Sequence, residues 1–115
     1  MNNASSDRPD AQTLFALYHL GVDGQGAYAF RNLMQCARHL GVDAETFRKW
    51  LKDNQIDQDV ITRVAFNLSA AHVDAQLAAD NDSRLALAKA SYAAFVAARA
   101  EGLGDVNLDV DYDEL

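Results

Sequence analysis

Apolar residues recur at intervals of three and four along most of this chain, and short breaks rich in glycine, aspartate or asparagine separate the blocks. This spacing places the apolar side chains on one face of an α-helix, whereas a half-buried strand would alternate apolar and polar residues. Breaks of this composition are where helices begin and end. No segment before residue 104 alternates in the manner of a strand. The pattern therefore predicts an all-α fold.

The breaks divide the chain into about five expected helices. The last two are rich in alanine, which favours helix and lets neighbouring helices approach closely. We expect the first three to form a trihelical core and the last two to form an antiparallel helical pair over 57–101. The expected helices are 10–21, 27–40, 43–53, 57–77 and, after a break at 80–83, a final helix that ends at Gly102.

Both ends of the chain depart from this pattern. Residues 1–9 are polar and end at Pro9, which predicts a disordered leader before a single helical domain over 10–103. The acidic tail, residues 104–115, alternates polar and apolar side chains, and five of its last eleven residues are acidic. Three interpretations stay open for this tail: it covers the basic segment 31–52, it pairs as a strand with another chain, or it is a solvated end.

The charge of the chain limits its partners. Ten Lys and Arg stand against 17 Asp and Glu, for a net charge of −7, so the protein as a whole is repelled by nucleic acid and by anionic membranes. Its single cysteine, Cys36, cannot form an internal disulfide. No apolar run approaches the roughly 18 residues of a membrane span. We expect a soluble, cytoplasmic protein that does not enter a membrane.

No catalytic or metal-binding motif is visible. His19, His39 and His72 are too far apart in the sequence for common metal-ligand spacings. The segment 24–26, Gly-Gln-Gly, lacks the preceding strand and the Gly-Lys-Ser/Thr of a phosphate-binding loop. The acidic tail lacks the sixth-position glycine of a calcium loop. We therefore expect neither enzymatic activity nor a metal or cofactor.

Residues 33–52, LMQCARHLGVDAETFRKWLK, have the pattern of a helix-turn-helix. Ala37 is small where the first helix approaches the second, and Gly41 follows four residues later, where the turn favours a positive φ. Apolar residues flank the turn and recur on one face of the second helix. The seven positions of this core are Cys36, Ala37, Leu40, Gly41, Val42, Phe47 and Trp50.

In this segment the chain resembles bacterial helix-turn-helix proteins, and it is most similar to motifs of the factor-for-inversion-stimulation type and to transposase-associated motifs. The residues that carry the resemblance are Ala37, Leu40-Gly41-Val42, Thr46-Phe47 and Trp50-Leu51-Lys52. Regulators of the first type usually end with this motif, whereas here the chain continues to residue 115. The resemblance implies that helix 43–53 lies in the major groove of DNA.

The resemblance also implies which side chains face DNA. Arg48 and Lys49 would read guanine edges, and Lys52 would contact phosphate. Five of the ten basic residues fall within 31–52, beside only two carboxylates, which is the charge pattern of a DNA-facing patch on an acidic protein. The expected DNA-binding residues are Arg31, Arg38, Ala44, Glu45, Arg48, Lys49 and Lys52.

Two functions are consistent with these features. The first is a small DNA-binding protein, a transcriptional regulator that acts as a homodimer on double-stranded DNA. One copy has too few cations to bind DNA tightly, whereas two copies bind a palindromic site with higher affinity. The alternative is an acidic protein–protein interaction module that keeps the helix-turn-helix-like fold without binding DNA. The local basic cluster favours the first function, and the net charge favours the second.

Overall fold

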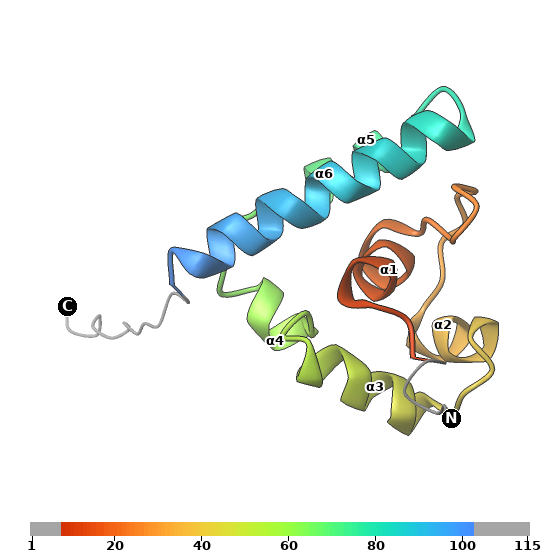
Figure 1. The fold of residues 1–115 in the computed structure, drawn as a ribbon, viewed down its shortest axis with the longest axis vertical. Helices are drawn as coiled ribbons and strands as arrows, with labels where there is room; N and C mark the ends of the chain where they lie inside the picture. The colour runs from red at the N-terminus through yellow and green to blue at the C-terminus, as the bar shows by residue number, and fades with distance from the viewer. Residues whose placement is uncertain (1–7, 103–115) are drawn as a thin grey trace.

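The computed structural model describes residues 8–102. In this range the chain is all-α, and an isolated antiparallel bridge between Val22 and Tyr28 is its only β-type pairing. The predicted fold class is therefore confirmed, while the predictions for residues 1–7 and for the acidic tail from residue 103 onward lie outside the described residues. The elements are α1 (Ala11–Phe15), the π-helical turn η2 (Ala16–Leu20), α2 (Leu33–His39), α3 (Ala44–Asp53), α4 (Gln58–Ile61), α5 (Leu68–Gln76) and α6 (Asn81–Ala100) (Figure 1).

The first helix begins and ends where the sequence predicts. The Asp10 side chain accepts a hydrogen bond from the backbone N–H of Thr13 at 2.9 Å, which satisfies one of the free donors of the first turn. The helix widens into η2, and Gly21 ends it with a φ of 74°. A side chain at Gly21 would collide with the Tyr28 ring and the Ala29 carbonyl, so this glycine is needed both for its φ and for space.

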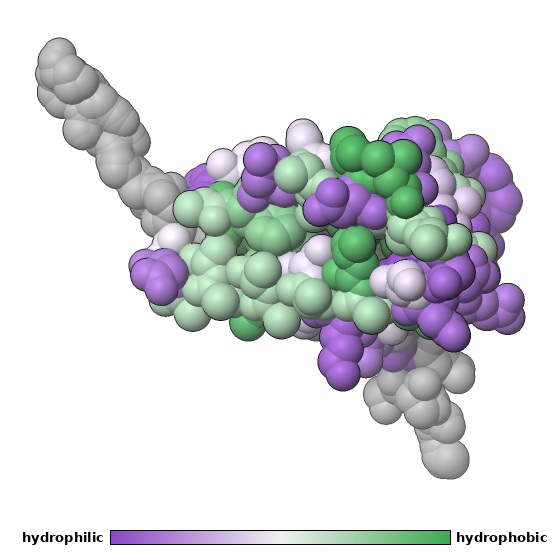
Figure 2. All heavy atoms as spheres, turned by 90° about the horizontal axis from the view of Figure 1, so that it is seen from above, coloured by the Kyte–Doolittle hydropathy of each residue, from purple (hydrophilic) through white to green (hydrophobic). Residues whose placement is uncertain are grey.

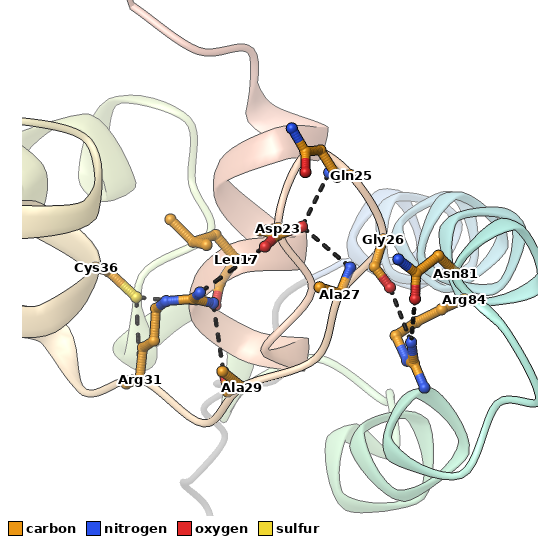
Figure 3. A network of polar contacts seen from close by, with 10 residues as sticks. All are labelled: Leu17, Asp23, Gln25, Gly26, Ala27, Ala29, Arg31, Cys36, Asn81 and Arg84. Atoms are coloured by element: carbon orange, nitrogen blue, oxygen red, sulfur yellow. Dashed lines mark hydrogen bonds and ion pairs between the residues drawn. The ribbon is translucent and has the colours of Figure 1, made fainter.

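The prediction of a second helix over 27–40 is wrong in its first half. Asp23 holds the segment 22–32 in a loop, because its carboxylate accepts hydrogen bonds from the N–H groups of Gln25 and Ala27 at 2.9 and 3.0 Å (Figure 3). The helix α2 starts only after Asn32, which forms a reciprocal capping box with Gln35.

The long helix predicted over 57–77 is also wrong, because the chain breaks into α4 and α5. The Thr62 hydroxyl donates to the Asp59 carbonyl at 2.9 Å, and α5 then starts afresh with the Asn67 side chain as its cap. The non-helical stretch between them turns Val64 and Phe66 toward the core. Side-chain bonds to the backbone thus end a helix that hydrophobic periodicity alone would continue.

The alanine-rich helices α5 and α6 form the predicted antiparallel pair, with Asp80 capping α6 through the Ser83 N–H at 2.7 Å. Arg84 fastens the pair, since its guanidinium donates to the carbonyls of Ala75 and Ala78 at 2.7 and 3.0 Å. The same guanidinium donates to the Gly26 carbonyl at 2.9 Å, which ties the 22–32 loop to α6 (Figure 3).

An aromatic cluster joins the helical pair to the N-terminal helix. Phe15 is fully buried, and its ring centroid lies 5.1 Å from that of Phe95, 5.3 Å from that of Tyr92 and 6.1 Å from that of Phe66. Aromatic rings at these separations add to the stabilisation that burial provides. The cluster fixes α6 against α1 and so sets the frame on which α2 and α3 are held.

Candidate nucleic-acid interface

The helices α2 and α3 are joined by a tight turn over residues 40–43. Gly41 has a φ of 74°, the left-handed conformation that the sequence predicts at this position. Asp43 follows the turn and caps α3, since its carboxylate accepts from the Thr46 N–H at 2.7 Å. That bond lowers the pKa of the Asp43 carboxyl, which therefore stays ionised at the positive end of the helix dipole.

Three of the seven predicted core residues of this pair of helices are buried, three are half-buried, and Gly41 in the turn is exposed. Cys36, Ala37 and Phe47 are at most 2% exposed, and Leu40 and Val42 are half-buried against them. Trp50, which the sequence places in the buried face, is only half-buried; the Arg8 guanidinium lies 5.7 Å from the centre of its ring. The fully buried position on this side of α3 belongs instead to Leu51, one helical turn after Phe47.

The opposite face of α3 is basic and exposed. The side chains of Arg48 and Lys49 are 52% and 72% exposed, and Lys52 is also exposed. Arg48 lies 3.7 Å from Glu45, and Lys49 lies 3.1 Å from Asp53, with both pairs on the surface of the helix. Surface ion pairs of this kind contribute about 0–1 kcal/mol, so a phosphate can replace them at little cost.

The other predicted DNA-binding residues divide into two groups. Arg38 is exposed and lines a shallow depression with Ala44, at the N-terminal end of α3. Arg31 instead turns into the 22–32 loop, where its side chain is only 17% exposed, 3.9 Å from Asp23 and 3.4 Å from the Ala29 carbonyl (Figure 3). We therefore keep Arg38 with the α3 side chains and leave Arg31 out of the candidate interface.

A groove that the sequence does not predict lies beside this interface. It has a volume of about 570 Å³, and the segment 30–33, η2, α4 and α5 line it. Phe30 stands at its rim with 72% of its surface exposed, and Val73 of α5 is 47% exposed. Exposed apolar side chains that gather around a groove are typical of binding surfaces.

Two histidines in the wall of the groove hold its elements together. Because a carbonyl can only accept, Nδ1 of His72 donates to the His19 backbone oxygen at 2.9 Å, and Nε2 of His72 lies 2.7 Å from the Tyr28 hydroxyl. Nε2 of His19 likewise donates to the Ile56 carbonyl at 2.6 Å. These bonds join α5, η2, the 22–32 loop and the entry to α4.

Burial of His19 makes stability depend on pH. Burial lowers the pKa of His19, although its bond to Ile56 and the charge of Asp57 oppose this shift. The unfolded chain therefore takes up a proton near pH 6.5, where folded His19 is still neutral, and the free energy of unfolding falls as pH drops below that value. We expect a decline between pH 7.5 and 5.5 of no more than about 1.4 kcal/mol per pH unit.

Urea unfolding at several pH values in this window measures the effect, and His19→Gln serves as the comparison because it keeps a donor without titrating. The variant is expected to have a flatter profile than the wild type. Carboxylates with lowered pKa, such as Asp43 and Asp80, act only at lower pH. Profiles of equal slope in the two proteins would contradict the assignment.

The remaining candidates for chemistry are packing groups. Burial raises the pKa of Cys36 to about 11, so its thiol is protonated at neutral pH, and its sulfur lies 3.8 Å from the Leu17 carbonyl and 3.9 Å from that of Arg31 (Figure 3). Within residues 8–102, no three His, Cys, Asp or Glu side chains come together in a way that could hold a metal ion.

Among the helices of residues 8–102, none is long and apolar enough to cross a membrane. No protein family, curated protein or solved structure matches this chain.

Proposed function

We propose that this protein is a small cytoplasmic DNA-binding regulator whose helix α3 lies in the major groove of double-stranded DNA. The observation that carries the proposal is the division of α3 into two faces. Phe47 and Leu51 are buried against the rest of the fold, while Arg48, Lys49 and Lys52 face solvent. A helix held rigidly in this way can present its cations to base edges and phosphates.

We further propose that the protein acts as a homodimer. A single α3 with few cations supplies little of the electrostatic energy on which DNA binding depends, and a second copy doubles it. The helices α5 and α6 support this, because Leu77 of α5 and Leu85 of α6 are 75% and 37% exposed. Figure 2, which looks down on these two helices, shows hydrophobic side chains over much of the face.

Arg48→Ala and Lys49→Ala are expected to weaken DNA binding without loss of the fold. Loss of one base-edge contact costs about 1–3 kcal/mol, which corresponds to roughly five- to 150-fold in Kd. Fluorescence anisotropy with a labelled random duplex, over a series of salt concentrations, measures the effect. Arg63→Ala removes the same charge from an exposed arginine beside α4 and is the matched control.

The same salt series can also contradict the proposal. A wild-type protein that shows no binding near 20 mM salt, where electrostatic binding is strongest, would contradict DNA recognition. Equal affinities for wild type, Arg48→Ala and Lys49→Ala would place the binding surface elsewhere. If the wild type does not bind DNA, the second candidate, an acidic protein-interaction module, takes precedence, and the groove with exposed Phe30 and Val73 favours it.

A further inference from the structure

The groove beside Phe30 continues directly into a second groove at the basic face of α3. The second groove has a volume of about 410 Å³, and the two share Tyr18, Leu33 and Gln58 in their walls. We call the two together the furrow. One end of it is apolar, with Phe30 and Val73, and the other end is polar and carries charge.

The charges at the polar end leave room for an anionic occupant. Arg48 and Lys52 line this end together with Asp57 and Asp59. Asp59 is already neutralised by Arg63 at 3.0 Å. Among residues 8–102, the Arg48 guanidinium has only the distant and 91% exposed Glu45, and no carboxylate lies within 4.0 Å of the Lys52 ammonium. Both cations are available to a carboxylate from outside.

An occupant that suits such a furrow alternates apolar and acidic side chains in an extended conformation. An extended chain directs successive side chains to opposite faces, so one set enters the apolar groove while the other meets the cations and solvent. Residues 105–113 of this chain, DVNLDVDYD, have this alternation, with four apolar and four acidic side chains. They lie outside the described residues.

We propose that residues 105–112 of the acidic tail occupy the furrow of the same molecule, with Val106, Leu108, Val110 and Tyr112 directed into it and the aspartates toward Arg48 and Lys52. The occupied furrow removes exposed apolar surface at Phe30 and Val73 from water. It also pairs Arg48 and Lys52 with carboxylates of the same chain, whose net charge is −7.

The position where the tail leaves the fold agrees with this occupant. The Arg99 guanidinium, in the last turn of α6, donates to the carbonyls of Asn54 and Gln55 at 3.1 and 2.8 Å. Gln58, which lines both halves of the furrow, follows three residues later, and Figure 1 shows α4 beside the C-terminal end of α6. Three residues separate Gly102 from Val106, and an extended chain advances about 3.3 Å per residue.

The short connection also favours the same molecule over a second copy. A segment tethered by a few residues is present at an effective concentration of the order of millimolar, far above the concentration of other copies in solution. Docking of the tail covers Arg48 and Lys52, so it is expected to compete with DNA for the basic face of α3. The docking itself does not depend on whether the protein binds DNA.

Hydrogen exchange of the full-length chain tests this inference without DNA. We expect the amides of 106–112 to exchange at least about tenfold more slowly in the wild type than in the double variant Leu108→Ser/Val110→Ser. Phe30→Ser, a change at an exposed side chain in the furrow, is expected to release the tail in the same way. Asn107→Ser, in the same segment but on its opposite face, is the matched control and is expected to keep the protection.

Equal, unprotected exchange of 106–112 in all four proteins would overturn the inference and leave the tail as a solvated end. Protection that rises with protein concentration, together with a dimer in sedimentation, would also overturn it in favour of strand exchange between two copies. If DNA binding is established separately, the double variant is expected to bind DNA more tightly than the wild type at low salt. A protein that does not bind DNA leaves the exchange result unaffected.

Discussion

Phe15→Ala is expected to lower the free energy of unfolding by about 3–5 kcal/mol, because Phe15 is fully buried at the centre of an aromatic cluster. The loss combines the transfer energy of the ring with the cavity left among Phe66, Tyr92 and Phe95. Tyr92 and Phe95 belong to α6 and Phe66 to the stretch before α5, so the cavity cannot close by a movement of one side chain. Equilibrium urea unfolding followed by circular dichroism measures the change.

Met34→Ala is the control for this prediction, since it truncates a large apolar side chain at a position that is 58% exposed. Its effect on the free energy of unfolding is expected to stay within about 0.5 kcal/mol. A loss of similar size in both variants would contradict the arrangement of the aromatic cluster.

Gly26→Ala is expected to destabilise the fold by about 2–4 kcal/mol, because a side chain here is excluded both by space and by conformation. A Cβ at Gly26 would overlap the Asn81 carbonyl oxygen and lie 2.9 Å from Leu85 Cγ, at the start of α6. The backbone oxygen cannot move without shifting the helix. The φ of 87° adds the strain of a left-handed residue.

Two other glycines separate these causes in the same urea experiment. Gly41 has a φ of 74° but open space around its Cβ position, so Gly41→Ala is expected to cost only the backbone strain of about 1–2 kcal/mol. Gly24 has neither restriction, and Gly24→Ala is expected to stay within about 0.5 kcal/mol of the wild type. Equal stabilities for the three variants would refute the close contact between the 22–32 loop and α6.

The sequence predicts a helix start well where the side chain of the residue before the helix accepts a hydrogen bond from the backbone of the first turn. Asp10, Asp43 and Asp80 each cap a helix, as their positions before apolar blocks indicate. Hydrophobic spacing fails between α4 and α5, because Val60, Val64 and Leu68 keep helical intervals while the backbone between them is not helical. No glycine or proline marks that break, so the periodic pattern could not reveal it.

The sequence likewise predicts some positions of the candidate interface and misses others. The exposure of Arg48, Lys49 and Lys52 follows from their spacing on one helix. The positions of Arg31 and Trp50 depend instead on Asp23 and Arg8, partners that lie far from helical spacing in the sequence. The furrow requires five segments to meet, namely 30–33, η2, α3, α4 and α5, which a single sequence does not specify.

Amide NMR spectra of the full-length protein, recorded during addition of a short DNA duplex at low salt, show whether the exposed face of α3 binds DNA. We expect the shifted amides to cluster at Arg48, Lys49 and Lys52 and at the N-terminal end of α3 beside Arg38, and the shifts to decrease as salt is added. Spectra that stay unchanged, or shifts confined to the helices α5 and α6, would contradict DNA binding by this face.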